Sequence, residues 1–344
     1  MATRYGYLKD KRVFLTGHTG FKGSWLCKVL LELGVEVYGY ALTPPTKPSL
    51  FEIIGIGRNM HSSIGDVRDL DKLEEAFNHA KPDYVIHMAA QPLVSIGQSN
   101  PVLTYSTNVM GTVNIMECVR KSSGVAGFLN VTTDKVYRNN EWSWGYRETD
   151  ALDGYAPYAN SKSCSELVTA SFKRTYNLPP IFTARAGNVI GGGDFLGNRI
   201  VPDCFRACAK GEPIILRNPK SIRPYQHVLE CLFGYLLLLS DTSKAGSYNI
   251  GPDAKDNITT EQIAKLFCNA WGNDASYKAI PLEKSFYEDA LLKLDTSLIR
   301  SIYGWEPRWN IAIAVEKSVE WYKAYQCGGD INAVMGNQIK EFMK

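Results

Sequence analysis

The sequence has no hydrophobic run long enough to span a membrane, no marked excess of either charge and no internal repeat. Its longest apolar stretch, LFGYLLLLS at 232–240, is far shorter than the roughly 20 residues of a transmembrane helix, so we expect a buried helix there. The net charge is only +3, from 38 basic and 35 acidic residues. This balance argues against nucleic acid or an anionic membrane surface as a partner.

The eight cysteines are scattered, and their spacing is typical of neither a disulfide framework nor a metal site. Cys204 and Cys208 lie four residues apart in VPDCFRACAKG, but neither a histidine nor a second cysteine pair stands nearby. We therefore predict no zinc site. Scattered cysteines without a signal-peptide pattern predict a reducing compartment, the cytoplasm.

Strand and helix patterns alternate through the first half of the chain. Strands are predicted at 11–17, 35–42, 83–90, 126–133 and 181–191, and helices at 24–34, 66–82, 101–122 and about 157–175. Such alternation implies a parallel sheet covered by helices on both faces, a Rossmann-type, doubly wound α/β fold. After about residue 187, glycine and proline become dense, which indicates a smaller second lobe.

A glycine-rich turn, TGHTGFKGSW, joins the first predicted strand to the first helix. Gly17, Gly20 and Gly23 allow a tight turn and a close approach of the backbone to a pyrophosphate, which predicts a dinucleotide site. The second strand ends YGYALTPP, without the acidic residue that usually binds the NAD ribose, so this position leaves NAD and NADP open. Asp66, after the next strand, is placed to meet the adenine amino group.

Tyr158 and Lys162 lie four residues apart in YAPYANSKSCSEL, and so on one face of a predicted helix. A free tyrosine has a pKa of about 10, and an ammonium group about 4 Å away can lower it by one to three units. The pair is therefore a candidate acid/base catalyst for a hydroxyl beside a nicotinamide. Thr133 lies between this pair and the glycine turn in the sequence.

These motifs, with HMAAQP and RAGNVIGGGD, resemble the extended short-chain dehydrogenase/reductase family of nucleotide-sugar enzymes. TGHTGFKGSW, TDKVYRNNEWSWGYRE, RIVPD and IRPYQHVLE resemble more narrowly its CDP-glucose 4,6-dehydratase branch, over nearly the whole chain. The resemblance implies an NAD-dependent lyase that makes CDP-4-dehydro-6-deoxy-D-glucose for bacterial surface polysaccharide such as O-antigen. The cytosine base rests on the resemblance alone, so a 4,6-dehydratase, 4-epimerase or 4-dehydrogenase for another nucleotide sugar stays an alternative.

The segment TTDKVY distinguishes between these reactions, because a hydrophobic strand ends there in an acid followed directly by an amine. A 4-epimerase needs no further acid and base, whereas a 4,6-dehydratase must remove the C5 proton and protonate the departing 6-hydroxyl. We expect Asp134 to be the acid and Lys135 the base, although exchanged roles stay open. A free lysine has a pKa of about 10.4, and burial can lower it toward neutrality. Tyr137 and the EWSWGYRE insert are expected to line the pocket, or simply to pack.

The resemblance implies three groups of site residues, which are catalytic, cofactor-binding and substrate-binding. The catalytic candidates are Thr133, Asp134, Lys135, Tyr158 and Lys162. The cofactor candidates are Gly17, Thr19, Gly20, Phe21, Lys22, Gly23, Asp66, Val67, Ala89, Ala90, Tyr158 and Lys162, and the substrate candidates are Asn188, Arg199, Arg223 and Glu288. Arginine suits a phosphate because its planar fork can donate two hydrogen bonds.

Two expectations concern the organisation of the whole protein. We expect a dinucleotide-binding domain at 1–186, joined by later segments near 225–250 and 308–326, and a mainly nucleotide-sugar-binding lobe at 187–344. The predicted helices at 101–121 and 157–175 have apolar stripes on two faces. In the family that the chain resembles, such helices pair across a dimer, which implies a homo-oligomer, a dimer or tetramer.

Overall fold

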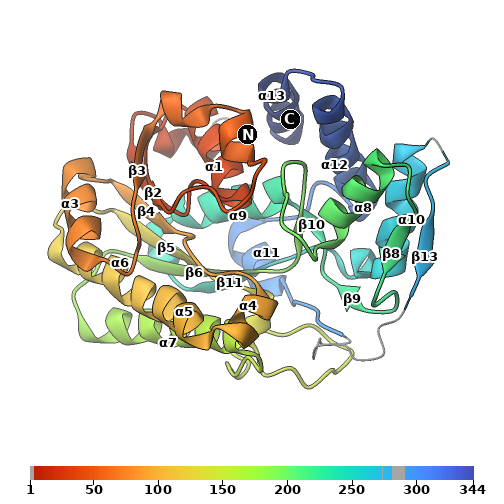
Figure 1. Cartoon of the computed structure of the whole chain (residues 1–344). Coiled ribbons are helices and arrows are strands. Elements are labelled where there is room, and N and C mark those ends of the chain that lie inside the picture. The colour runs from red at the N-terminus through yellow and green to blue at the C-terminus, as the bar shows by residue number, and fades with distance from the viewer. Residues whose placement is uncertain (1–3, 273, 281–290) are drawn as a thin grey trace.

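The computed structural model describes residues 4–272, 274–280 and 291–344, and its centre is a seven-stranded parallel sheet (Figure 1). In chain order the strands are β1 (Arg12–Thr16), β2 (Glu36–Ala41), β3 (His61–Ile64), β4 (Tyr84–His87), β5 (Gly127–Val131), β6 (Ile181–Ala186) and β11 (Ser247–Ile250). They lie in the spatial order β11-β6-β5-β4-β1-β2-β3, and every neighbouring pair is parallel. This arrangement confirms the predicted doubly wound fold.

Helices cover both faces of the sheet (Figure 1). One side carries α1 (Phe21–Glu32), α9 (Val228–Leu239) and α13 (Ile331–Phe342), and the other carries α3 (Leu70–Ala80), α5 (Pro101–Tyr105), α6 (Gly111–Lys121) and α7 (Pro157–Thr175). Successive side chains of a strand point to opposite faces. Accordingly, Val13 and Leu15 belong to the core beneath α1 and α9, whereas Phe14 belongs to the core beneath α3 and α6.

All twelve residues of α9 are buried, as expected for its LFGYLLLL run. This helix lies between the sheet and the C-terminal helix α13, and the rings of Phe233 and Phe342 stack at 5.1 Å. Among the described residues, no helix combines the length and the apolar character that crossing a membrane requires.

The structure corrects the expected bounds or continuity of several elements. The strand expected at 181–191 ends at Ala186 and resumes as β7 (Val189–Ile190) in another sheet, and between them Gly187 packs so closely that a Cβ there would lie 2.5 Å from Pro224 Cγ. Helix α3 begins at Leu70, since the Asp69 carboxylate caps it by accepting a hydrogen bond from the Lys72 N–H at 3.2 Å. The helix expected at 101–122 is helical through Lys121 but contains a π turn, η4 (Ser106–Met110).

Shorter elements build the connections and the second lobe. The helices are α2 (Leu50–Ile53), α4 (Val94–Ser99), α8 (Ile200–Ala209), α10 (Thr260–Trp271), α11 (Ser297–Tyr303) and α12 (Ile311–Gln326). Three two-stranded ladders join β7 to β10 (Gln226–His227), β8 (Ile214–Leu216) to β13 (Tyr277–Ala279), and β9 (Ile222–Arg223) to β12 (Ile258–Thr259). Helices α8, α10 and α12 pack together on the right of Figure 1.

Candidate active site

The glycine turn forms a cradle at the N-terminus of α1. Gly17 has a φ of 80°, and its N–H donates to the carbonyl of Tyr40 at 2.9 Å. A Cβ at Gly17 would lie 2.8 Å from Ala89 N, and one at Gly23 would lie 2.1 Å from Gly17 O. Only glycine fits these two positions, and no side chain caps the N-terminus of α1, whose first N–H groups have no partner within the helix. The cradle therefore has the shape and polarity that a pyrophosphate needs.

Buried hydrogen bonds hold the loop that follows β4. Thr16 Oγ1 accepts from the N–H groups of Met88 and Ala89, each at 3.1 Å, and lies 2.7 Å from His87 Nδ1. Burial, and then the charge of Lys162, lower the pKa of His87 to about 3, so this histidine is neutral. The loop with Ala89 and Ala90 thus lies at the carboxyl edge of the sheet, beside the glycine turn.

The second and third strands end at the same edge. Thr19 Oγ1 donates to the carbonyl of Leu42 at 2.8 Å, and the Leu42 side chain is exposed. The Asp66 carboxylate accepts from the backbone N–H of Arg68 at 2.9 Å and from its Nε at 2.9 and 3.0 Å. These hydrogen bonds lower the pKa of Asp66. Val67 is buried and packs on Gly111, the first residue of α6. A contact of Asp66 with adenine stays a prediction.

The Asp134–Lys135 pair lies in a single 3-10 turn, η5 (Asp134–Val136), that follows β5. Thr133 has extended backbone geometry before the turn, and its Oγ1 donates to Asp134 Oδ1 at 2.8 Å. Asp134 is 1% exposed, and its Oδ2 has no hydrogen-bond partner among the described residues. Lys135 is half-buried. An acid and an amine therefore lie at the end of a central strand, and one oxygen of the acid is buried without a hydrogen-bond partner among the described residues.

Tyr158 and Lys162 lie on the first turns of α7, which faces η5. Burial raises the pKa of Tyr158 more than the Thr133 hydroxyl lowers it, whereas the sequence suggested a pKa lowered by Lys162. Lys162 is 4% exposed, and its Nζ donates to the carbonyl of Val131 at 3.1 Å. Burial, and then the charge of Lys22, lower the pKa of Lys162 to about 8. Thr133 thus lies between Tyr158 and the Asp134–Lys135 turn. The order of these residues in the sequence does not reveal that they are neighbours in space.

Lys22 links the glycine turn to this cluster. Its Nζ donates to the hydroxyl of Tyr235 at 2.7 Å. Burial lowers the pKa of Lys22, and its charge interacts with those of Arg199 and Asp134. Tyr235 was not among the residues predicted from the sequence, although its single hydroxyl within the apolar run LFGYLLLL was a usable signal.

The predicted substrate residues lie in three places. Arg199 Nη1 is 3.0 Å from the carboxylate of Asp194, and the charge of Arg199 acts on Tyr158. Arg223 is 2% exposed, and its Nη1 donates to the carbonyl of Ile222 at 3.0 Å. Asn188 lies between β6 and β7, where its carbonyl accepts from the N–H of Gln226 at 2.9 Å. Glu288 lies outside the described residues.

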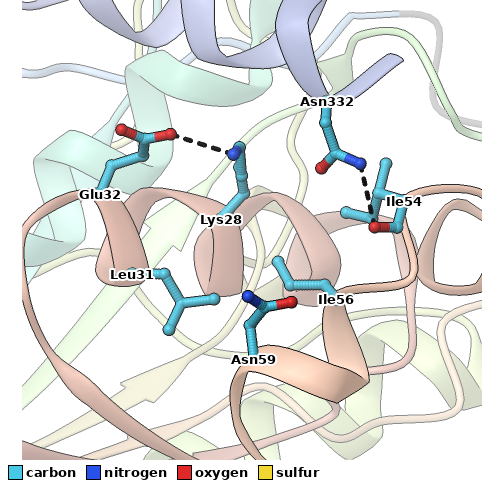
Figure 2. A pocket seen from close by; sticks show the side chains of 7 residues that line it. All are labelled: Lys28, Leu31, Glu32, Ile54, Ile56, Asn59 and Asn332. Atoms are coloured by element: carbon cyan, nitrogen blue, oxygen red, sulfur yellow. Dashed lines mark hydrogen bonds and ion pairs between the residues drawn. The ribbon is translucent and has the colours of Figure 1, made fainter. Parts of the chain in front are cut away.

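A hollow of about 640 Å³ lies between α1, the segment at 54–59 and α13, and Figure 2 shows the seven side chains that line it. Lys28 Nζ lies 3.0 Å from Glu32 Oε1, and Asn332 Nδ2 donates to the carbonyl of Ile54 at 3.1 Å. None of the predicted site residues lines this hollow. It marks the place where α13 packs across α1, not the site of the chemistry.

Known proteins resemble the chain in sequence and in fold. The family model described as GDP-mannose 4,6 dehydratase matches residues 14–318. The CDP-glucose 4,6-dehydratase of Salmonella typhimurium is 44% identical over 350 residues, which cover 98% of this chain and 97% of that protein.

Two solved structures resemble the fold equally well. The dTDP-glucose 4,6-dehydratase DesIV of Streptomyces venezuelae, with NAD bound, has a TM-score of 0.80 at 25% identity and covers 93% of this chain and 99% of its own. The UDP-glucose 4-epimerase of Thermus thermophilus, also with NAD, has a TM-score of 0.80 at 25% identity and covers 91% and 99%. Because a dehydratase and an epimerase score alike, overall shape does not select the reaction.

Proposed function

The chain belongs to the GDP-mannose 4,6 dehydratase family, and we propose that it is a lyase that converts CDP-D-glucose to CDP-4-dehydro-6-deoxy-D-glucose. The observation that carries this proposal is the packing of α7 against η5, which puts the Asp134–Lys135 turn beside the hydroxyl-activating Tyr158. The 44% identity to a CDP-glucose 4,6-dehydratase supports the choice of nucleotide and sugar.

The residues at the cradle fit NAD. At Gly17 and Gly23 any Cβ would clash with the backbone of Ala89 and of Gly17, so only glycine keeps the turn this tight, and the N-terminus of α1 provides N–H groups for the pyrophosphate. Lys22, Phe21 and Ala89 border the same turn. NAD supplies, when bound, a two-electron acceptor and donor for the sugar carbons C4 and C6. Because the reaction restores the cofactor, the enzyme consumes no NAD.

Tyr158 removes the proton of the sugar 4-hydroxyl. The Thr133 hydroxyl lowers the pKa of the phenol, and we assign to the ammonium of Lys162, one helical turn further along α7, the stabilisation of the phenolate that forms. The carbonyl of Val131 fixes the position of this ammonium. Proton transfer at O4 thus depends on residues from β5 and α7 acting at one point.

Asp134 and Lys135 carry out the elimination. The Lys135 amine takes the C5 proton, which the C4 ketone has made acidic, and the C5–H electron pair forms the C5–C6 double bond. The C6–O bond breaks, and Asp134 gives its proton to the departing hydroxyl, which leaves as water. Asp134 Oδ2, buried and without a protein partner among the described residues, is the oxygen available for this transfer. Exchanged roles for the two residues are the alternative.

A 4-epimerase or 4-dehydrogenase is the second candidate, because the Thermus thermophilus epimerase matches the fold as well as a dehydratase does. Either reaction needs the cradle, Tyr158 and Lys162 but leaves Asp134 and Lys135 without a role. The buried carboxyl of Asp134 therefore favours dehydration.

The substrate and assembly complete the proposal. We propose that the lobe at 187–344 binds the nucleotide sugar against the cofactor domain at 1–186, through Arg199, Arg223, Asn188 and Glu288.

Three apolar side chains are at least half exposed on α5, η4 and α7: Val102, Met110 and Leu167. We propose that these helices pair in a homo-oligomer, and that the enzyme works in the bacterial cytoplasm on deoxysugars for lipopolysaccharide.

The deciding experiment is incubation with CDP-glucose and NAD in deuterium oxide. Dehydration should give a 4-keto-6-deoxy sugar nucleotide with deuterium at C5 and no net NADH. An epimerase would give an isomer of unchanged mass, and a dehydrogenase would accumulate NADH, so either result would overturn the lyase assignment. UDP-, GDP- and dTDP-glucose tested in parallel would show whether cytidine is preferred.

A further inference from the structure

A buried ion pair lies beside the catalytic turn and is not used in the steps above. Glu166 follows Lys162 by one turn of α7, and Arg185 lies on β6; each is 3% exposed. Two contacts of 3.0 Å join them, from Nε to Oε1 and from Nη2 to Oε2. Burying two charges costs several kcal/mol of desolvation per ion, so such a pair adds little net stability. Its position points to another role.

The pair holds both ends of the turn that carries the proposed acid and base. Before the turn, Thr132 Oγ1 donates to Glu166 Oε1 at 2.5 Å. After it, Arg185 Nη1 donates to the Tyr137 hydroxyl at 2.9 Å, and the guanidinium carbon lies 5.1 Å from the centre of that ring. The Asp134–Lys135 segment lies between these two attachments.

Further hydrogen bonds hold the side chains around the Glu166–Arg185 pair in place. Thr183 Oγ1 donates to Glu166 Oε2 at 2.8 Å, so both carboxylate oxygens bind a hydroxyl as well as the guanidinium. The Tyr137 hydroxyl donates to Asn249 Oδ1 at 2.6 Å, and Asn249 Nδ2 donates to the carbonyl of Tyr146 at 2.8 Å. The Tyr137 and Tyr146 rings stack at 5.3 Å. Tyr146 of the aromatic insert thus packs directly against Tyr137.

We propose that Glu166 and Arg185 are positioning residues that fix the Asp134–Lys135 turn relative to Tyr158, so that C5 deprotonation can follow oxidation at C4. This inference rests on the proposed dehydration. O4 and the C5 hydrogen are on neighbouring carbons of one ring, so the two proton-removing groups must keep a fixed separation. Glu166 supplies it because it shares α7 with Tyr158 and binds Thr132, two residues before the turn begins. A displacement of about 1 Å can lower a rate by about 100-fold.

The test separates the two halves of the reaction in the NAD-loaded enzyme. In Tyr137→Phe, the ring stack is kept and only the hydroxyl that Arg185 holds is removed. With CDP-glucose in single turnovers, we expect the rate of water loss, followed by mass spectrometry, to fall at least about tenfold. The rate of NADH formation, followed at 340 nm, should change less than about twofold. A control is Tyr248→Phe, which removes another buried hydroxyl, bonded to the Lys244 carbonyl at 2.6 Å, and should change neither rate.

A second pair of variants tests the other end of the turn. Thr132→Val removes the hydroxyl bonded to Glu166, and Thr132→Ser retains it, so the valine should slow water loss selectively and the serine should restore it. If Tyr137→Phe and Thr132→Val keep the wild-type ratio of the two rates, including the case in which both rates fall equally, the positioning role is wrong. If the wild type forms no dehydrated product, the proposed function itself is wrong.

Discussion

Asp134 and Lys135 are neighbours in the sequence but differ in their surroundings. The carboxyl is buried and bonded to Thr133, whereas the lysine is half-buried, with its side chain beyond the strand end. The residue types and their order after a strand could be read from the sequence. Their connection to Tyr158 through Thr133 could not, because it depends on how α7 packs on β5.

Lys135→Ala should separate the chemical steps. The variant loses the proposed base for C5 but keeps Tyr158 and Lys162, so water loss should fall by at least about 100-fold, within the range for a general base. A transient NADH absorbance should persist. Lys72→Ala, a surface lysine outside the site, is the control and should behave as wild type. Loss of the NADH signal together with the product would contradict the role assigned to Lys135.

The pKa of Lys162, lowered to about 8, predicts how activity depends on pH. Below pH about 8 the ammonium is charged and stabilises the Tyr158 phenolate; as pH rises through this value, it loses its proton. We therefore expect kcat/KM to decline above pH about 8, as a profile of initial rates would show. Lys162→Arg should remove this decline, since arginine stays charged, even if its rate is lower. A wild-type profile that is flat to pH 10 would contradict the prediction.

The elements around the site were predictable where local chemistry defines them. Helix α7 was expected at about 157–175 and spans Pro157–Thr175, because proline favours the first turn of a helix. The glycine turn before α1 was equally predictable from the sequence. Glu166 and Arg185 were not identified, because their functions depend on contacts with residues 34 and 48 positions away, Thr132 and Tyr137. Such pairing depends on the order of strands in space, which periodicity does not report.

Gly23→Ala should disrupt the cradle between β1 and α1. The added Cβ would lie 2.1 Å from Gly17 O, so the turn must open and its N–H groups must move. We expect NAD affinity, measured by calorimetric titration, to fall by at least about tenfold, which corresponds to about 1.4 kcal/mol. Gly124→Ala is a matched control, because no atom lies within 4 Å of its Cβ position. Unchanged NAD affinity in Gly23→Ala would show that the cradle does not hold the cofactor.

At the scale of the whole molecule, Glu230 joins α9 to the segment between α11 and α12. Its Oε1 accepts from the backbone N–H groups of Arg308 and Trp309, at 2.9 and 2.6 Å. The side chain is 1% exposed, and burial raises its pKa from 4.5 to about 7. The folded protein therefore holds a proton here that the unfolded chain releases between pH 4.5 and 7, so stability declines as pH rises through this range.

Glu230→Gln should remove this pH dependence while it retains a carbonyl oxygen for the two N–H groups. The free energy of unfolding of the variant, relative to wild type, should increase by about 3 kcal/mol between pH 4.5 and 8, since each pKa unit corresponds to about 1.36 kcal/mol. Urea unfolding at several pH values would measure it. Glu212→Gln, whose carboxyl is on the surface, should show no such trend. A constant difference between the Glu230→Gln variant and wild type would rule out ionisation of Glu230 as the cause.

The packing of α13 on α1 has a consequence for how the protein is made. Residues 331–342 leave the ribosome about 300 residues after α1, which is about 15 to 60 s at ordinary rates of synthesis. Throughout that time, the face of α1 that α13 covers has not met its final neighbour. The first βα unit must therefore stay soluble with this face uncovered until translation is almost finished.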